Sequence, residues 1–206
     1  MICLFGGTFD PIHLGHMHAA LTVCEALSLD QVHMVLSAQP AHRDPTGATS
    51  QQRWQMLELA CESQPQLVAD DREMRRSGPS YTVDTLTDAR AECGADPLCW
   101  VIGSDALADL PSWQRWRDVL RLCNLVVLSR PGSQEVYPEA VRELLAQRAT
   151  DAVPNEPTGQ VFVVEARMRS ISASQVRHAL AVGGAVEHLL PARVAAYISE
   201  HGLYGA

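Results

Sequence analysis

The sequence predicts an α/β fold built on a mostly parallel sheet with helices on both faces. Short apolar runs of strand length recur along the 206 residues, and longer segments with helical spacing lie between them. Strands that alternate with helices indicate βαβ units. The strand-like runs are continuously apolar, which suits strands covered on both faces. With 47% hydrophobic residues the chain can fill such a core, and its length suits one domain over residues 1–206.

Six segments have the length and apolar content of buried strands. In chain order these are Ile2–Phe5, Val32–Ser37, Leu67–Ala69, Cys99–Gly103, Leu125–Ser129 and Val161–Val164. Helices are expected where apolar residues recur every three or four positions. The marking positions are Met17, Leu21, Cys24 and Leu27; Trp54, Leu57 and Cys61; Leu86, Ala89 and Cys93; Val119 and Leu122; Val176 and Leu180; and Val194 and Ile198. The last two helices predict a short helical C-terminal part, roughly 171–206.

Polar segments rich in proline, glycine or charge predict the loops. They are Asp44–Ser50, Arg72–Ser80 and Thr150–Gly159. Because loops at strand ends line the ligand crevice of an α/β sheet, such segments are candidates for the site. The charge cluster Arg72–Arg76 is expected to be a solvated loop.

Charge and composition exclude several functions. The net charge is −8, which argues against a broad nucleic-acid surface. All 16 basic residues are arginine, so no Schiff-base or Walker lysine is available. No run approaches the ~20 apolar residues of a membrane span, and no basic segment precedes an apolar stretch at the N-terminus. We therefore expect a cytoplasmic protein that binds neither nucleic acid nor membrane. The six cysteines form no C-x-x-C pair and are expected to be reduced, buried thiols.

The stretch Gly6–His16 has the features of a phosphate-binding turn. A strand that ends in two glycines lets the backbone turn sharply and approach a ligand closely. A helical pattern follows, and the amide groups at a helix start favour an anion. His13 and His16 lie three positions apart, can face the same side and can donate to phosphate oxygens, more strongly when charged. The alternative is a tight turn that carries two surface histidines.

The string G-G-T-F-D-P-I-H-L-G-H resembles the signature of the nucleotidyltransferase superfamily, in which an H-x-G-H element binds ATP phosphates. Class I aminoacyl-tRNA synthetases carry a similar element, but they are usually much longer and use a lysine-bearing loop. Later segments resemble, in order, those of bacterial nicotinate mononucleotide adenylyltransferases. These segments are Pro40–Arg43, Arg76–Leu86, Gly103–Asp105 with Leu110–Trp113, Ser129–Gly132, Ile171–Arg177 and Leu203–Tyr204. The departures are Ala41 for proline, Arg43 for lysine, Ala173 for serine and Ser174 for threonine.

The resemblance implies a Rossmann-like, doubly wound fold and a reaction in NAD biosynthesis. The adenylyl group of ATP passes to nicotinate mononucleotide, giving nicotinate adenine dinucleotide (deamido-NAD) and pyrophosphate. The attacking phosphate is already an anion, so no general base is required, and catalysis should come from positioning and charge stabilisation. Mg²⁺ should be carried by the ATP phosphates and not by a protein metal site. Oligomeric state is not readable from the sequence, and a homodimer stays open.

The resemblance also implies roles for individual residues. The catalytic residues would be His16, His13 and Arg177. ATP would contact Gly6, Gly7, Thr8, Phe9, His13, His16, Gly103, Asp105, Ile171, Ser172, Ser174 and Arg177. The mononucleotide would contact His42, Arg43, Tyr81, Thr82, Trp113 and Arg130.

Several of these residues also have a reading from local pattern alone. Trp113 follows Leu-Pro-Ser, a natural helix start, and could stack on a pyridine ring or simply pack. Tyr81 and Thr82 lie near another helix start, whose amides suit a carboxylate, although side-chain capping explains them too. Asp105 ends a strand and could accept from ribose hydroxyls or cap a helix. Arg177 lies one turn into a helix, and its alternative is an exposed surface arginine.

Four other functions stay open at this point. The chain could adenylylate nicotinamide mononucleotide or phosphopantetheine, although the Ser80–Thr82 and Trp113 elements favour a pyridine nucleotide. It could be a non-catalytic nucleotide sensor on the same fold, which intact His13, His16 and Arg177 argue against. Binding to nucleic acid is disfavoured by the charge.

Overall fold

The computed structural model describes residues 1–41, 45–132 and 135–206. In these ranges seven strands form one sheet in the order β3-β2-β1-β4-β5-β7-β6, and every pair is parallel. The strands are β1 (Ile2–Gly7), β2 (Val32–Leu36), β3 (Leu67–Asp70), β4 (Leu98–Gly103), β5 (Asn124–Ser129), β6 (Ala149–Thr150) and β7 (Val161–Glu165). The predicted Rossmann-like α/β fold with a parallel sheet is therefore confirmed.

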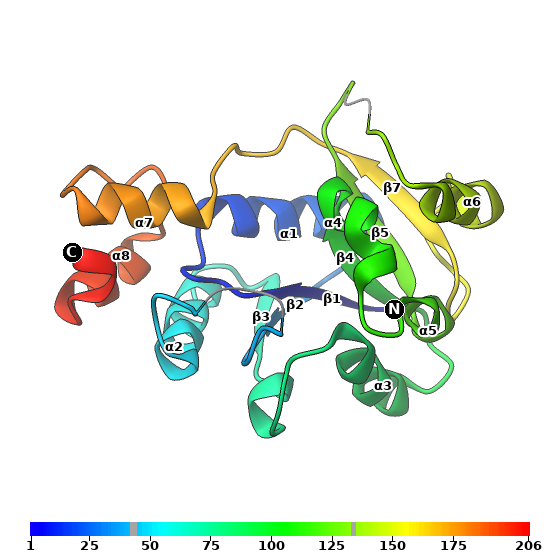
Figure 1. Cartoon of the computed structure of the whole chain (residues 1–206), viewed down its shortest axis with the longest axis horizontal. Helices are drawn as coiled ribbons and strands as arrows, with labels where there is room; N and C mark the ends of the chain where they lie inside the picture. Colours follow the sequence, from blue (N-terminus) through cyan, green and yellow to red (C-terminus); the bar gives the residue numbers. More distant parts are fainter. Residues whose placement is uncertain (42–44, 133–134) are drawn as a thin grey trace.

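Helices cover both faces of the sheet, and Figure 1 shows α1 and α3 on opposite sides of the strands. The α-helices are α1 (Leu14–Leu27), α2 (Ser50–Cys61), α3 (Thr82–Cys93), α4 (Ser104–Asp109), α5 (Trp116–Leu122), α6 (Glu139–Arg148), α7 (Ala173–Ala181) and α8 (Ala192–Glu200). Three 3-10 helices are η1 (Arg72–Arg75), η2 (Leu110–Ser112) and η3 (Leu203–Gly205). One core contains the buried side chains of α1, α2, α7 and α8, and the other contains those of α3, α5 and α6.

Successive residues of one strand enter the two cores alternately. In β1, Cys3 packs with α1 and α2, whereas Leu4 packs with α3 and α5. In β4, Cys99 packs in the first core and Trp100 in the second. Both faces of these strands are apolar because neither meets water, which explains why the strands read as continuous apolar runs.

The structure differs from the sequence-based expectation in its least periodic elements. Neither α4 nor α6 was predicted: α4 has six residues, too few for a periodic pattern, and α6 buries only Val141 and Leu144. The two-residue strand β6 includes the start of the segment expected as a loop. The cluster Arg72–Arg76 is not a solvated loop, because it contains η1 and its Glu73 is only 6% exposed.

The cysteines are free thiols, as predicted, and all except Cys93 are buried. Burial raises the pKa of Cys61 to about 12 and that of Cys99 to about 11, so both keep their protons. No helix in the described ranges has the length and hydropathy needed to cross a bilayer.

The strand order reverses between β1 and β4, which are neighbours in the sheet although β2 and β3 lie between them in the chain. Such a switch point leaves a crevice outside the carboxyl ends of the strands, because the loops on either side of it turn in opposite directions. The Gly6-Gly7 turn at the end of β1 lies at this point.

Candidate functional site

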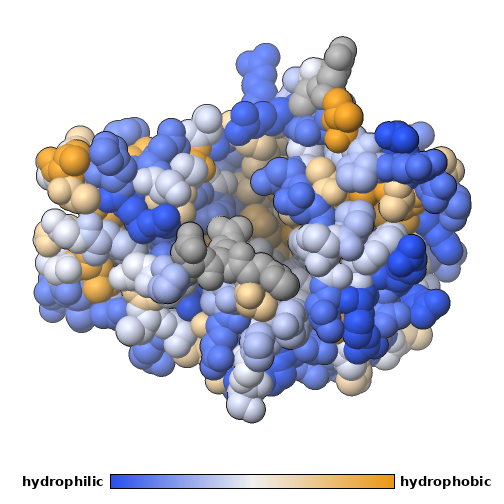
Figure 2. Space-filling model, viewed as in Figure 1, coloured by the Kyte–Doolittle hydropathy of each residue, from blue (hydrophilic) through white to orange (hydrophobic). Residues whose placement is uncertain are grey.

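A cleft of about 890 Å³ opens at the end of β1. Figure 2 shows the hollow near the middle of the viewed face, with a mostly hydrophilic rim. Segments far apart in the sequence meet around it. The lining residues are Phe5, Gly6, Gly7, Thr8, Phe9, Asp10, His16, Ala41, Pro45, Thr46, Asp105, Ala173 and Arg177. The structure therefore gathers seven of the predicted ATP-binding residues around one cavity.

A second cavity of about 230 Å³ shares Phe5–Thr8, the end of β1 and the residue after it, with the first. Its other side is formed by Glu73, Thr82 and Trp113. A smaller hollow of about 110 Å³ continues along Ser80–Thr82 and Trp113. Two compartments thus share the turn at the end of β1.

The two glycines of this turn make room for aromatic rings. A Cβ on Gly6 would overlap the ring of Trp100, and a Cβ on Gly7 would overlap the ring of Phe9. Phe9 is 1% exposed and adopts a φ of 47°, which bulky residues rarely do. The backbone of the turn is therefore exposed to the cavities while its aromatic neighbours are packed.

His13 and His16 lie at the start of α1, and their rings stack with centroids 3.6 Å apart. His13 is the N-cap: its Nδ1 accepts from the amide of His16 at 3.3 Å. Burial lowers the pKa of His13 to about 4, so its ring is neutral at pH 7 and carries its proton on Nε2. His13 can therefore donate to an anion only as a neutral imidazole, without the added strength of a charged donor. The ring of His16 lines the cleft and packs edge-on against the ring of Phe9, with the ring centroids 5.1 Å apart.

Helix α7 brings Arg177 to the opposite wall of the cleft. Ser172 caps α7 and forms a capping box with Gln175, so its hydroxyl accepts from the Gln175 amide at 3.2 Å. Arg177 donates from Nη1 to the main-chain oxygen of Asp10 at 2.7 Å and from Nη2 to Ser174 Oγ at 3.4 Å. The predicted helix start with a cation one turn inside it is confirmed.

The segment before α7 reaches α1 because Gly15 has no side chain. A Cβ on Gly15 would lie 3.3 Å from Cβ of Ile171 and 3.0 Å from Nδ1 of His13. Ile171 thus packs beside the histidine turn without lining either cavity. Its predicted ATP contact stays a prediction.

The smaller cavity is bounded by the start of α3. Tyr81 is the N-cap of α3 but caps it with no side-chain hydrogen bond. The Ser80 hydroxyl instead accepts from the amide of Gln39 at 3.0 Å, and the Ser80 amide donates to the Gln39 oxygen at 2.8 Å. The Ser80 hydroxyl therefore does not cap α3, and Ser80 and Thr82 both line this cavity.

Two predicted local structures need correction. Trp113 does not begin a helix: it follows η2, and α5 begins only at Trp116 because Arg115 takes a left-handed conformation with a φ of 50°. Asp105 does not end β4, since β4 stops at Gly103 and Asp105 lies exposed in the first turn of α4. Both side chains nevertheless line the cavities.

The remaining predicted residues are less well placed or lie outside the described residues. Gly103 lines the smaller cavity and not the larger one. Arg130 follows β5 at the same sheet edge but is exposed and lines neither cavity. His42 and Arg43 lie outside the described ranges, between Ala41 and Pro45, which both line the larger cleft.

Arg53 is a site-supporting residue that the sequence reasoning missed. Its side chain is 1% exposed, and its guanidinium donates to the main-chain oxygens of Thr8, Ser37 and Ala38 at 2.7, 2.7 and 2.9 Å. It thereby ties the loop after β1 to the loop after β2. Its place among helical apolar positions in α2 gave no signal of this.

Glu73 was missed as well, because it lies in a run of charges. Its Oε1 accepts from the hydroxyl of Thr85, which also accepts from Arg76 Nη2 at 3.0 Å. The other oxygen, Oε2, is buried with no partner among the described residues. A buried carboxylate therefore lies in the wall of the smaller cavity.

The third missed group centres on Asp10, which is 7% exposed. Its carboxylate accepts from the hydroxyl of Tyr204 at 2.7 Å and from the amides of Gly47 and Ala48 at 2.9 and 3.2 Å. Asp10 occurs within the first motif, but nothing in the sequence indicates that Tyr204 is its partner.

The described residues contain no group of three or more His, Cys, Asp and Glu side chains that could hold a metal ion. The donors that face the larger cleft are imidazole, guanidinium, hydroxyl and main-chain amide groups. This chemistry suits a polyanion, and a cation bound to that polyanion would take its ligands from phosphate oxygens and water.

Comparison with known proteins agrees with this geometry. The model of the cytidylyltransferase-like family matches residues 4–179. A protein of Pseudomonas syringae pv. tomato is 45% identical over all of this chain and 94% of its own length. A protein of Aeromonas salmonicida is 42% identical over all of this chain and 97% of its own length. Both bear the name probable nicotinate-nucleotide adenylyltransferase.

Solved structures share the fold at low identity. The nicotinic acid mononucleotide adenylyltransferase of Plasmodium falciparum complexed with NaAD has a TM-score of 0.76 and 18% identity, over 98% of this chain and 96% of its own. The putative nicotinate-nucleotide adenylyltransferase of Vibrio parahaemolyticus has a TM-score of 0.64 and 16% identity, over 99% of this chain and 94% of its own. The chain belongs to the cytidylyltransferase-like family and, within it, to the family of the nicotinate-nucleotide adenylyltransferases.

Proposed function

We propose that this protein transfers the adenylyl group of ATP to nicotinate mononucleotide and releases pyrophosphate, a step of NAD biosynthesis. The observation that carries the proposal is the pair of cavities that share Phe5–Thr8 at the end of β1. ATP would occupy the larger cleft and the mononucleotide the smaller one. Their reacting phosphates would then meet at the shared turn, where the strand order reverses.

The larger cleft supplies donors to the triphosphate. Arg177 lines this cleft from α7 and His16 lines it from α1. His13 stacks on His16 but is 3% exposed and lines neither cavity, so its contact with the phosphates stays a prediction. The mononucleotide phosphate oxygen attacks the α-phosphorus of ATP, the bond from this phosphorus to the bridging oxygen of the β-phosphate breaks, and pyrophosphate leaves. Because the nucleophile is already anionic, these residues act by orientation and by stabilising developing charge. Mg²⁺ bound to the phosphates would neutralise part of that charge.

The smaller cavity suits a pyridine ring with a carboxylate. The first amides of α3 would bind the carboxylate, and Trp113 would stack on the ring. From the motifs that they match, we propose that His42, Arg43 and Arg130 contact the phosphate of the mononucleotide. The cytoplasmic location and a homodimer stay predictions.

The test is pyrophosphate release by the purified protein with ATP, MgCl₂ and one acceptor at a time. Nicotinate mononucleotide should give the highest kcat/KM, followed by nicotinamide mononucleotide. A preference for the amide would contradict the carboxylate site at α3, and turnover of phosphopantetheine alone would contradict the pyridine pocket. Tight ATP binding without turnover of any acceptor would make the protein a sensor.

A matched variant separates the two compartments. Trp113→Ala should raise the KM for the mononucleotide about tenfold, in line with the ~1–3 kcal/mol of base–aromatic stacking, and leave the KM for ATP within twofold. Trp116→Ala, three residues further on, is the control because this ring lines neither cavity. Equal changes in both KM values for Trp113→Ala would contradict the stacking role.

A further inference from the structure

Tyr204 lies in η3, contacts the cleft residue Asp10 and adopts an unusual backbone conformation. Its φ is 60° and its ψ is 18°, in the left-handed region that aromatic residues rarely adopt. Such a conformation persists only where the surroundings hold it. Here the hydroxyl donates to Oδ1 of Asp10 at 2.7 Å. Burial and this hydrogen bond raise the pKa of Tyr204 above its usual range, so the hydroxyl keeps the proton it donates.

Gly47 independently indicates that this place of the Tyr204 ring is built in. A Cβ on Gly47 would lie 2.8 Å from Cε1 of the ring and 3.6 Å from Cδ of Arg177. The φ of Gly47 is not in the left-handed region, so the backbone alone does not require glycine there. The absent side chain instead lets Tyr204 and Arg177 approach the same loop.

The hydrogen bonds of Asp10 determine how Arg177 is held. Oδ1 accepts from Tyr204 and from the amide of Ala48, and Oδ2 accepts from the amide of Gly47. Arg177 donates to the main-chain oxygen of Asp10 at 2.7 Å, while its Nη1 stays 3.8 Å from Oδ2. The carboxylate is thus satisfied by neutral donors, and the guanidinium is anchored without a close ion pair.

We infer that Tyr204 is a positioning residue for adenylyl transfer: its hydroxyl occupies the Asp10 carboxylate and so keeps Arg177 available to the phosphates of the nucleotide. Without the hydroxyl, Oδ1 loses its shortest hydrogen bond, and among the described residues Arg177 is the cation that forms an ion pair with this carboxylate, at 3.8 Å from Oδ2. A bidentate pair with Asp10 would turn the guanidinium away from the cleft. This inference rests on the proposed function and adds to it a residue that touches no substrate.

The test compares Tyr204→Phe with Tyr197→Phe. The first change removes one oxygen and keeps the ring, so the fold should be retained. Tyr197 is the matched control, since its ring stacks on His201 at 4.0 Å and takes no part in the Asp10 contacts. We expect Tyr204→Phe to lower kcat about tenfold, the loss typical of one hydrogen bond to a charged group, with both KM values within twofold. Tyr197→Phe should leave kcat unchanged.

A double-mutant cycle separates positioning from a merely structural role. If the hydroxyl acts on the charge of Asp10, Tyr204→Phe should have little further effect on kcat in an Asp10→Asn background. Equal losses in both backgrounds would overturn the inference, as would a normal kcat for Tyr204→Phe. An inactive wild-type protein would instead contradict the proposed function.

Gly47→Ala gives a second, independent variant. Its methyl group would displace the Tyr204 ring from Asp10 without entering either cavity, so it should reproduce the kcat loss with little change in KM. A normal kcat for Gly47→Ala, in a protein of unchanged thermal stability, would overturn the inference even if Tyr204→Phe did not fold.

Discussion

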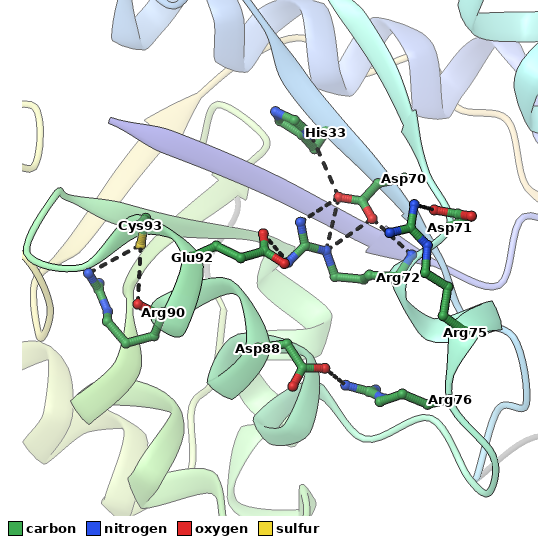
Figure 3. A network of polar contacts seen from close by, with 10 residues as sticks. All are labelled: His33, Asp70, Asp71, Arg72, Arg75, Arg76, Asp88, Arg90, Glu92 and Cys93. Atoms are coloured by element: carbon green, nitrogen blue, oxygen red, sulfur yellow. Dashed lines mark hydrogen bonds and ion pairs between the residues drawn. The ribbon is translucent and has the colours of Figure 1, made fainter.

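Two carboxylates of this molecule are each held close to an arginine, but they are held in opposite ways. Asp70, at the end of β3, accepts from Arg72 Nε at 3.0 and 2.9 Å and from Nη2 at 2.8 Å (Figure 3). Arg72 also forms an ion pair with Glu92, with 3.3 Å between Nη1 and Oε2. Asp10, in the cleft, instead accepts from two amides and a hydroxyl, and Arg177 Nη1 stays 3.8 Å from its Oδ2.

The exposure of the two arginines follows this difference. The side chain of Arg72 is 13% exposed, whereas that of Arg177 is 37% exposed and lines the larger cleft. A bidentate pair fixes both partners and leaves the cation little capacity for a ligand. An arginine that forms a bidentate pair with a carboxylate thus stabilises the fold. An arginine beside a carboxylate that neutral donors already satisfy is available to bind a ligand.

Arg177→Met should have the largest effect, because it removes the arginine that lines the larger cleft. Loss of the cation that faces the phosphates should lower kcat by about 10²–10³-fold, the range for removing one donor to a developing charge. The thermal midpoint should change little because the methionine keeps most of the side-chain stem. Steady-state kinetics and a thermal melt measure both quantities, and a kcat within threefold of wild type would contradict the assignment.

Arg72→Met should show the opposite pattern. The variant leaves the buried carboxylate of Asp70 without its main partner, so the free energy of unfolding should fall by about 2 kcal/mol. The kcat and both KM values should stay near wild type, since Arg72 lines neither cavity. Urea unfolding followed by tryptophan fluorescence gives the stability. A large kcat loss in a folded variant would contradict a purely structural role for Arg72.

The fold could be predicted from the sequence because the strands are apolar on both faces and the helices between them are periodic. It also located Gly6, His16 and Arg177, whose motif patterns reflect local turns and helix starts. It could not show that Asp10 meets Tyr204 or that Arg53 joins two loops, since these contacts span 194, 45 and 16 residues and depend on packing. Nor could it separate Glu73 from its charged neighbours, because burial of one residue in a polar run leaves no periodic signal.

The smallest expected effect concerns the pH dependence of stability, which reports on the charge of Asp70. Burial raises the pKa of Asp70, but the contacts with His33 and Arg72 outweigh it, so the pKa of Asp70 lies well below its usual range. A carboxyl whose pKa is lowered by folding stabilises the protein above its unfolded pKa of about 3.9 and loses that contribution as the pH falls below it. The stability advantage of wild type over Asp70→Asn should therefore be constant from pH 7 to 5 and shrink by roughly 1 kcal/mol as the pH falls further. Urea midpoints measured across this range test the prediction. An advantage that stays constant down to pH 3 would mean that Asp70 is held by packing and not by its charge.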